Sequence, residues 1–418
     1  MIYMKNVYDL RYENNLIYIL PERAYADAKK IPLEVYSRTV IILYLYYMDT
    51  LSVYLGYVNN IPKDIDIYVI SSRDEVLAEV RHYMKASNRH KVHYIWKQNR
   101  GRDVSALLVS SKDIVKKYEY VCFLHDKKEH LPQEKQDTDF WIANLWGNQI
   151  GSPHYIDEIL RMFEKKERLG ILVPPEPVGD IFTTWFGYGW HGAYDITKKI
   201  ADRMALHADI SSDKAPITFG TVLWFRTKAL MKLFDLGWQY SDFQDEKLND
   251  ENYLSYGLER IFAYVAQDAG YETGTVMSVS YAEKQTKYLQ YAASRIMHEK
   301  DDFFPISNMR KLEIYLKNRG KVIAFAKGSR ELYLYGTGKM GKLCLFMLGY
   351  EYILPTGWII SKGERPGTLY GIPVFLIDEV EITQDIAVII TVENATVQEQ
   401  MVLQLENKGV SNYIRFWD

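Results

Sequence analysis

The sequence is poor in cysteine and has no long apolar run. Its 418 residues include two cysteines, Cys122 and Cys344. Both stand in apolar patterns, so we expect buried thiols in a reducing compartment rather than a disulfide or a zinc site. The longest apolar stretch, residues 40–48, is too short to span a bilayer and is followed by Asp49. The opening segment, MIYMKNVYDLRYENN, lacks the apolar core of a signal peptide. We therefore expect a cytoplasmic chain without a transmembrane segment, whose contact with a membrane would be peripheral.

A basic excess and several catalytic motifs are also missing. The formal net charge is −3, which does not indicate the basic footprint of a nucleic-acid-binding protein. The sequence contains no GxSxG, no P-loop, no HExxH and no CxxC pair. We expect no nucleic-acid partner and none of the functions that these motifs define.

The sequence does contain a regular alternation of apolar strands and amphipathic helices from about residue 38. This alternation predicts an α/β fold with a parallel sheet covered on both faces. Ligands of such sheets bind at the carboxyl ends of the strands. The pattern marks four of these ends: Tyr47–Asp49, Ser71–Asp74, Asn99–Asp103 and His125–Lys128.

The length predicts two or three domains. We expect a first α/β domain over residues 1–310, with its core at 38–285, and a charged connecting segment over 311–329. A small Rossmann-like α/β domain is predicted over 330–418, because a strand, a glycine-rich turn and a helix open it.

The turn Asn99-Arg100-Gly101-Arg102-Asp103 is the first candidate site. It joins a strand to a helix, so the arginines and the helix-start NH groups would favour a phosphate, and Asp103 could bond a ribose or sugar hydroxyl. A helix capped by Asp103 with exposed arginines explains the same residues equally well.

Two further candidates are charged. At the fourth strand end, Asp126 is the only carboxylate that could hold a divalent metal, Mg or Mn, and Lys127 could neutralise a diphosphate without one; a solvated polar turn is the alternative.

Glu259 and Arg260 lie in a late amphipathic helix. Glu259 could take a proton from an acceptor hydroxyl, and an internal ion pair with Arg260 is the structural alternative.

The last candidate is the turn Gly336-Thr337-Gly338-Lys339-Met340-Gly341, a GxGxxG pattern between a strand and a helix. The next strand ends at Ile360-Ser361-Lys362, without the acidic residue that binds the ribose of NAD. The motif therefore predicts a Rossmann-like ligand turn at Gly336, Gly338 and Gly341, and we expect no NAD.

Taken in order, several segments resemble the rhamnan synthesis protein F family, glycosyltransferases of bacterial surface polysaccharide assembly that are similar to GT-A enzymes. They cover roughly residues 40 to 282. The matching segments are ILYLYYMD (42–49), NRGRDVSALL (99–108), FLHDKK (123–128), FGTVLWFRTKAL (219–230) and the YGLER–AGY helix (256–271).

The resemblance implies roles for individual residues. Donor binding falls to Asn99, Gly101, Arg102 and Asp103 in the N-x-G-R-D turn, to His125 and Lys127 in the H-x-K element, and to Arg226. Glu259 and Arg260 match the catalytic E-R pair. Two departures stand out: the D-x-D metal motif is missing, and Tyr256-Gly257-Leu258 replaces the usual His-Ala-Ile.

The function that the resemblance implies is transfer of a sugar, plausibly rhamnose, from a nucleotide diphosphate sugar to a growing cell-surface polysaccharide or lipid-linked glycan. The reaction would be inverting, with Glu259 as base, at the cytoplasmic face of the cell membrane. The C-terminal segment resembles Rossmann-like modules attached to sugar transferases. Two alternatives stay open: an NAD-dependent sugar-modifying oxidoreductase built on the GTGKMG turn, and a non-catalytic nucleotide-sugar-binding protein.

Overall fold

The strands of the first part of the chain form one twisted sheet. The computed structural model describes residues 15–24, 31–128, 135–175, 190, 192–212, 216–218, 220–243, 253–298, 309–363, 367–383 and 385–417, and its contacts divide the chain into units 1–289 and 290–418. Within the described part of the first unit the sheet has eight strands in the order β1-β8-β6-β7-β5-β2-β3-β4. Their bounds are β1 Asn15–Leu20, β2 Thr39–Tyr44, β3 Asp66–Ser71, β4 Val92–Trp96, β5 Tyr120–His125, β6 Leu169–Val173, β7 Leu223–Arg226 and β8 Glu272–Ser278.

Strand direction decides which segments meet at each edge of this sheet. Neighbouring strands are parallel, except that β7 runs antiparallel to both β5 and β6. The carboxyl ends of the parallel strands therefore share one edge with the beginning of β7. The end of β7 lies at the opposite edge, where Arg226 pairs with Tyr120 at the start of β5.

The chain path predicts a ligand crevice outside the carboxyl ends of β2 and β5. From β2 the chain continues outward to β3 and β4, and it then returns to β5 on the other side of β2. This reversal is a topological switch point, which is where open α/β sheets bind their ligands. The predicted site segments Tyr47–Asp49 and His125–Lys128 follow the two strands that border it.

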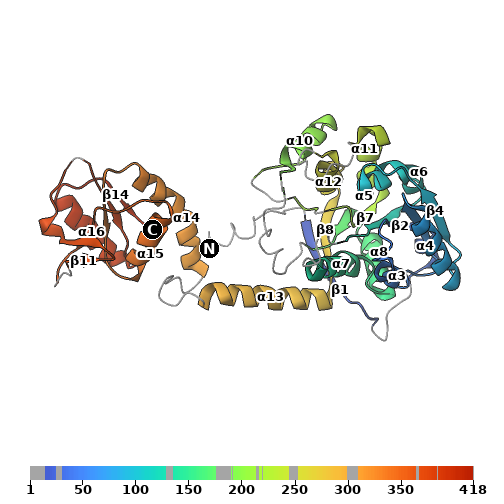
Figure 1. Ribbon diagram of the computed structural model, residues 1–418, viewed down its shortest axis with the longest axis horizontal. Coiled ribbons are helices and arrows are strands. Elements are labelled where there is room, and N and C mark those ends of the chain that lie inside the picture. Colours follow the sequence, from blue (N-terminus) through green and yellow to red (C-terminus); the bar gives the residue numbers. More distant parts are fainter. Residues whose placement is uncertain are drawn as a thin grey trace. The chain divides into compact units, whose positions relative to one another are not determined.

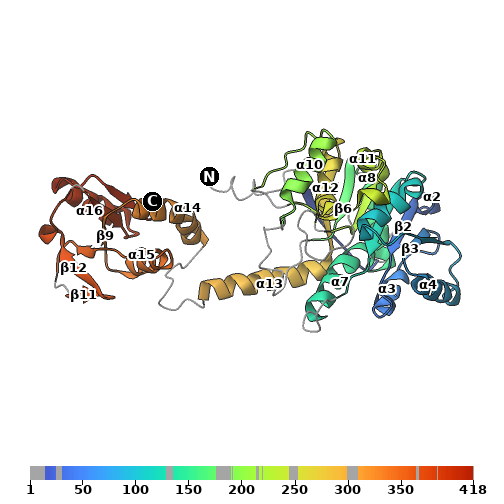
Figure 2. The same cartoon turned by 45° about the horizontal axis from the view of Figure 1, so that its top comes forward.

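Helices cover both faces of the sheet because its strands are apolar on both faces (Figures 1 and 2). In β2, Ile41 and Leu43 pack on one face, and Val40, Ile42 and Tyr44 pack on the other. The first face is covered by α2 Leu33–Ser37, α3 Leu51–Val58, α4 Asp74–Ala86, α7 Lys135–Ile150 and α8 Pro153–Lys165. The second is covered by α5 Arg102–Ser105, the π-helix η1 Ala106–Ser110, α6 Lys112–Val115, α10 Tyr194–Arg203, α11 Thr227–Phe234, η3 Tyr240–Asp242 and α12 Leu254–Asp268, and α13 Val279–His298 follows β8.

The second unit has a sheet of its own, in the order β11-β12-β10-β9-β13-β14 within the described residues. All neighbouring pairs are parallel except β11 with β12. The elements are α14 Met309–Lys327, β9 Glu331–Tyr335, α15 Lys339–Tyr350, β10 Gly357–Ile360, β11 Thr368–Leu369, β12 Ile372–Leu376, η4 Ile377–Glu379, β13 Ile386–Ile390, α16 Ala395–Asn407 and β14 Tyr413–Arg415. Two α/β units with mainly parallel sheets agree with the fold class expected from the sequence. Along the described residues, no helix combines the length and the apolar character that crossing a bilayer requires.

The segment 311–329, expected to be a charged connection, is instead almost entirely helix α14. Tyr315, Val322 and Ala326 lie in the core of the second unit, and the Asn318 amide donates a hydrogen bond of 3.1 Å to the carbonyl of Phe416. The spacing of these residues places them on one face of a helix. The many lysines and arginines of the segment obscured this stripe in the sequence.

The glycine turn of the second unit has the predicted strand–turn–helix setting, and its three glycines differ in what they require. Gly336 has φ +112°, a conformation that disfavours other residues. A Cβ on Gly341 would lie 2.1 Å from the carbonyl oxygen of Gly336, whereas one on Gly338 would meet nothing within 4 Å. Gly341 is therefore needed for close packing of α15 on the turn, and Gly338 borders open space.

We expect Gly341→Ala to lower the free energy of unfolding of the second unit by about 1–3 kcal/mol, because the added methyl group must displace the backbone of the turn. The matched substitution Gly338→Ala should leave stability within about 0.5 kcal/mol of wild type. Urea unfolding of the full chain measures both. Equal losses in the two variants would contradict this assignment.

Candidate active site at the carboxyl edge of the first sheet

Asp103 and His125 form the buried centre of the predicted site. Asp103 lies in the first turn of α5, and His125 is the last residue of β5. Their side chains are 9% and 7% exposed, and His125 Nε2 lies 3.8 Å from Asp103 Oδ2. This carboxylate oxygen has no hydrogen-bond partner among the described residues. A buried acceptor without a donor is costly, so the position is suited to a ligand that brings one.

The protonation of His125 follows from its backbone contact. Its Nδ1 lies 3.0 Å from the carbonyl oxygen of Asp126. A carbonyl can only accept a hydrogen bond, so Nδ1 carries the proton. Burial lowers the pKa of His125, against the raising effect of the negative charges of Asp103 and Glu259. The ring is therefore neutral near pH 7, and Nε2 presents a lone pair toward Asp103.

Asp103 itself is held as an anion. Burial alone would raise its pKa, but His125, the neighbouring Thr221 hydroxyl and Lys127 together lower it. Thr221 acts through proximity, because its hydroxyl has no hydrogen-bond partner among the described residues. The site thus contains two adjacent acceptors, one charged and one neutral.

Asp126 ties β5 to the chain that leaves β2. Its Oδ2 accepts hydrogen bonds of 2.7 Å from the backbone NH groups of both Tyr46 and Tyr47. Its own NH donates to the carbonyl of Tyr44 over 3.1 Å. Burial raises the pKa of this carboxyl to about 7 despite the two NH donors. Asp126 therefore links the ends of the two strands, and one of its two carboxyl oxygens is already occupied by two NH groups.

The pKa of Asp126 predicts a pH-dependent stability. Because the folded-state pKa of about 7 lies above the usual 3.8, the folded chain keeps a proton that the unfolded chain releases between these values. Stability is therefore lost as pH rises through this window, by about 4 kcal/mol in total. Asp126→Asn cannot titrate, so the stability of wild type relative to this variant should fall from pH 4 to pH 7 in urea unfolding.

Asp49→Asn provides the control for this measurement. Asp49 is exposed, and its hydrogen bond with Lys128 lowers its pKa. Its removal should give a pH dependence of the opposite sign. A wild-type and Asp126→Asn pair with parallel pH profiles would show that Asp126 is ionised in the folded chain.

Two aromatic residues, Tyr54 and Trp141, position Lys127 beside the crevice. Its backbone NH donates to the Tyr54 hydroxyl, and that hydroxyl donates to the Lys127 carbonyl, both over 2.6 Å. Its ammonium group lies 4.1 Å from the centre of the Trp141 ring, within range of a cation–π interaction. The positive charge is thus held next to Asp103 and His125.

Glu259 and Arg260 reach the same region from α12. Arg260 Nη1 lies 3.0 Å from Glu259 Oε2, and their side chains are 11% and 18% exposed. The charge of Glu259 raises the pKa of His125, which places the carboxylate within electrostatic range of the buried pair. Gly257, two residues earlier, allows α12 to pack closely on α10, because a Cβ at position 257 would lie 2.8 Å from Ile200 of α10.

The turn before α5 is strained. Gly101 and Arg102 both have left-handed backbones, with φ of +69° and +45°. A Cβ on Gly101 would lie 2.5 Å from the ring of Phe243, so only glycine fits. The Arg102 guanidinium lies 6.0 Å from the centre of the Tyr253 ring, and Asn99 is exposed. Such strain concentrates at functional sites.

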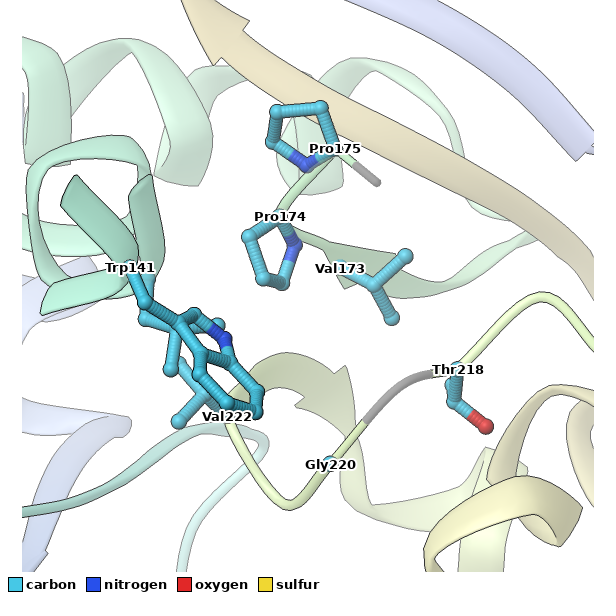
Figure 3. Close-up of a pocket in the computed structure, with 8 residues that line it drawn as sticks. Trp141, Val173, Pro174, Pro175, Thr218, Gly220 and Val222 are labelled. Carbon is cyan, nitrogen blue, oxygen red and sulfur yellow. The ribbon is translucent and has the colours of Figure 1, made fainter. Parts of the chain in front are cut away.

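A small pocket adjoins this site, and the sequence did not point to it. Figure 3 shows Trp141 and Thr218 on opposite sides, with Pro174 and Pro175 between them. The Thr218 hydroxyl is buried without a hydrogen-bond partner among the described residues. Thr218 and Thr221 precede β7, and they lie at this edge because β7 runs antiparallel to its neighbours. No local sequence signal reveals the direction of β7. The pocket is lined by Trp141, Leu145, Val173, Pro174, Pro175, Thr218, Gly220 and Val222.

Arg226 is not part of the site, which corrects its predicted role in donor binding. It stands at the end of β7, at the opposite edge of the sheet from His125. A strand of this length separates the two edges by about 17–20 Å. Its guanidinium bonds Glu119 Oε1 at 2.6 Å and the carbonyl of Phe163 at 2.9 Å, so its role is structural.

Arg226→Met should therefore reduce stability without affecting donor binding. Breaking a fully buried ion pair costs about 3–5 kcal/mol. Because Glu119 is 35% exposed and keeps Arg38 as a second partner, we expect a loss of no more than about 3 kcal/mol here. Urea unfolding and calorimetric titration with a nucleotide diphosphate sugar would separate the two effects. Wild-type stability with weakened binding would restore the donor-binding role.

The glycines of the second unit, Gly336, Gly338 and Gly341, belong to a separate sheet. The strand after this turn, β10, is followed by Ser361, whose hydroxyl lies 2.7 Å from the Tyr335 hydroxyl and 2.9 Å from Gln404 Oε1. The residue after β10, the second strand of this unit, is thus occupied by hydrogen bonds within the protein.

The first unit is therefore an α/β protein with a charged, partly apolar site at a topological switch point. A family model described as rhamnan synthesis protein F matches residues 2–271, more than half of the chain. The chain belongs to this family. Membership confirms the family predicted from the sequence, and the two mainly parallel sheets confirm the α/β class.

Individual relatives are distant. Two proteins named uncharacterized protein WxcX, from Xanthomonas campestris pv. campestris strains B100 and ATCC 33913, are each 22% identical over 237 residues. These matches cover 56% of this chain and 32% of each relative, so the chain spans about a third of their length. Among solved structures, the mannosyltransferase PcManGT from Pyrobaculum calidifontis, in complex with GDP-Man and Mn²⁺, is 13% identical with a TM-score of 0.34. That match covers 84% of this chain and 86% of the other.

Proposed function

We propose that the chain is a glycosyltransferase that moves a sugar such as rhamnose from a nucleotide diphosphate sugar to a growing cell-surface polysaccharide or lipid-linked glycan. The observation that carries the proposal is the convergence of Asp103, His125, Lys127 and Glu259, from three separate segments, on one edge of the sheet. This edge contains the switch-point crevice. With a lipid-linked acceptor, the reaction would take place at the cytoplasmic face of the cell membrane.

The buried acceptor pair suits a hydroxyl of the donor. Asp103 Oδ2 has no partner among the described residues, and His125 Nε2 faces it at 3.8 Å with a lone pair. A sugar or ribose hydroxyl between them could donate to one of the two acceptors. Recognition of this kind is selective, because a ligand without the hydroxyl leaves the buried carboxylate unsatisfied.

The diphosphate would be neutralised by side chains of the protein. Lys127 supplies a fixed ammonium group beside the crevice, and Arg102 supplies a guanidinium at the start of α5. These charges would stabilise the nucleoside diphosphate as it departs. Asn99 and Gly101 belong to the same turn and would contribute backbone or amide contacts.

The side chains do not fit a resident Mg or Mn ion well. Asp126, the predicted ligand, already accepts two backbone NH bonds through one oxygen. Among the described residues, no three histidine, cysteine or acidic side chains are grouped as a metal site. We therefore assign no step to a metal.

Glu259 is the proposed general base. The acceptor oxygen would attack the anomeric carbon while the bond from this carbon to the phosphate oxygen breaks, and the electron pair leaves with the nucleoside diphosphate. Glu259 would take the proton of the acceptor hydroxyl, and Arg260, bonded at 3.0 Å, would hold the carboxylate in place. Attack opposite the leaving group inverts the anomeric configuration.

Glu259→Gln should lower kcat for sugar transfer by about 10²–10⁴-fold, the usual contribution of a general base. Donor affinity in calorimetry should remain within a few-fold of wild type, because the amide preserves the shape of the side chain. Product formation from a panel of nucleotide sugars gives the rate, and NMR of the product gives the anomeric configuration.

The matched control is Glu283→Gln, which changes an exposed glutamate that pairs with Lys287. It should transfer at the wild-type rate. Full activity in Glu259→Gln would show that Glu259 is not the base. Donor binding without turnover in wild type, across the panel, would favour a non-catalytic nucleotide-sugar-binding protein.

A further inference from the structure

In the second unit, the part of helix α14 from residue 314 onward carries charged side chains of one sign only. From residue 314 to residue 330 the sequence contains no aspartate or glutamate, although the whole chain has a net charge of −3. The charged side chains of α14 in this stretch are exposed, while Tyr315 and Val322 face the core. The exposed cations of the helix within this stretch are Lys317, Arg319, Lys321 and Lys327.

Beside this helix, the turn between α15 and β10 presents large apolar side chains to solvent. Tyr350 is 83% exposed, Tyr352 is 97% exposed and Leu354 is 79% exposed. Tyr352 also has φ +59°, an uncommon conformation for an aromatic residue. Three such residues within five positions are more than the scattered apolar residues of an ordinary surface.

Two cations of the helix, Arg319 and Lys327, contact the turn. Glu351, between the two exposed tyrosines, lies 2.9 Å from Lys327 and 3.5 Å from Arg319. Leu316, 60% exposed, stands one helical turn before Arg319 on the same side of α14. Both elements belong to the second unit and can be followed in Figure 1. We call this the basic–aromatic surface: Leu316, Lys317, Arg319, Lys321, Lys327, Tyr350, Tyr352 and Leu354.

We propose that the basic–aromatic surface binds a membrane that contains anionic lipids. Lysine and arginine side chains are attracted to the negative headgroups, and the positive charge of the patch complements them. Tyrosine favours the membrane interface, because its ring is apolar and its hydroxyl reaches water, and Leu354 can enter the acyl boundary. This proposal goes beyond the transferase function and does not depend on it.

The shape of the surface favours a membrane over a protein partner. Protein interfaces gain most from anchors that fill pockets on a shape-complementary partner. Here the apolar side chains project from a turn at nearly full exposure. Arg319 and Lys327 pair with Glu351, while Lys317 and Lys321 are exposed on the same helix without an ion pair among the described residues. A fluid headgroup layer accepts such a projection without a matching cavity.

The test is co-sedimentation of the full chain with phosphatidylcholine vesicles, with and without phosphatidylglycerol. We expect binding to the anionic vesicles only, weakened by added salt. Lys317→Gln with Lys321→Gln should lower the partition coefficient about thirtyfold, or about fivefold for each lysine removed. Neither lysine is part of an ion pair reported for the described residues, so the fold should be kept.

The apolar contribution has its own variant and control. Tyr352→Asn with Leu354→Ser should weaken binding at least tenfold, and asparagine tolerates the left-handed backbone at position 352. Lys63→Gln with Lys85→Gln in the first unit, and Leu403→Ser on α16 of the second, remove exposed side chains of the same kinds elsewhere. These controls should bind as wild type does.

Three results would overturn the proposal. The first is no binding of wild type to anionic vesicles, and the second is an equal loss in the control variants. The third is a wild-type dimer, detected by analytical ultracentrifugation, that Tyr352→Asn converts to a monomer, since a second copy would then cover the surface. Transfer to a soluble acceptor should be unchanged in the lysine variant, so failure of this proposal is distinguishable from failure of the transferase function.

Discussion

Asp126 links the two strands that border the crevice, and the arrangement of the site depends on this link. Its carboxyl oxygen accepts the NH groups of Tyr46 and Tyr47 at the end of the β2 segment, and its own NH bonds back to Tyr44. His125, one residue earlier, is thereby held with its ring toward Asp103. Lys127, one residue later, is held by Tyr54. One buried carboxyl thus sets the positions of the neutral ring and of the positive charge on either side of it.

The surroundings of Asp126 explain how one site can contain both neutral and charged side chains. Burial favours the neutral forms of His125 and Asp126, whereas Asp103 remains an anion because positive and polar groups surround it. Asp103 has one carboxylate oxygen without a hydrogen-bond partner among the described residues, and a fixed ammonium group lies close to it. The first provides an acceptor for a hydroxyl and the second a partner for a phosphate. A nucleotide-sugar donor would supply both the hydroxyl and the phosphate.

Much of the fold was predictable from the sequence because the strands are long apolar runs and the helices are amphipathic. The turn at residues 99–103, the strand end at His125 and the glycine turn of the second unit were recognisable from local patterns and spacing. Two features were not. Arg226 ends an aromatic strand, so from the sequence it could belong to the site. Because β7 runs antiparallel, Arg226 lies at the opposite edge of the sheet. In α14, frequent lysines and arginines hid the stripe that packs on the second unit.

By itself, the sequence determined the α/β class, the family, and the residue types available for chemistry, since these depend on periodicity and on local order. Only the tertiary structure decided which of those residues share a site. Strand direction separates Arg226 from His125 and brings in Thr218 and Thr221, while packing of α12 on α10 through Gly257 brings Glu259 within range of His125. Direction and packing are long-range properties, and no local pattern of side chains encodes them.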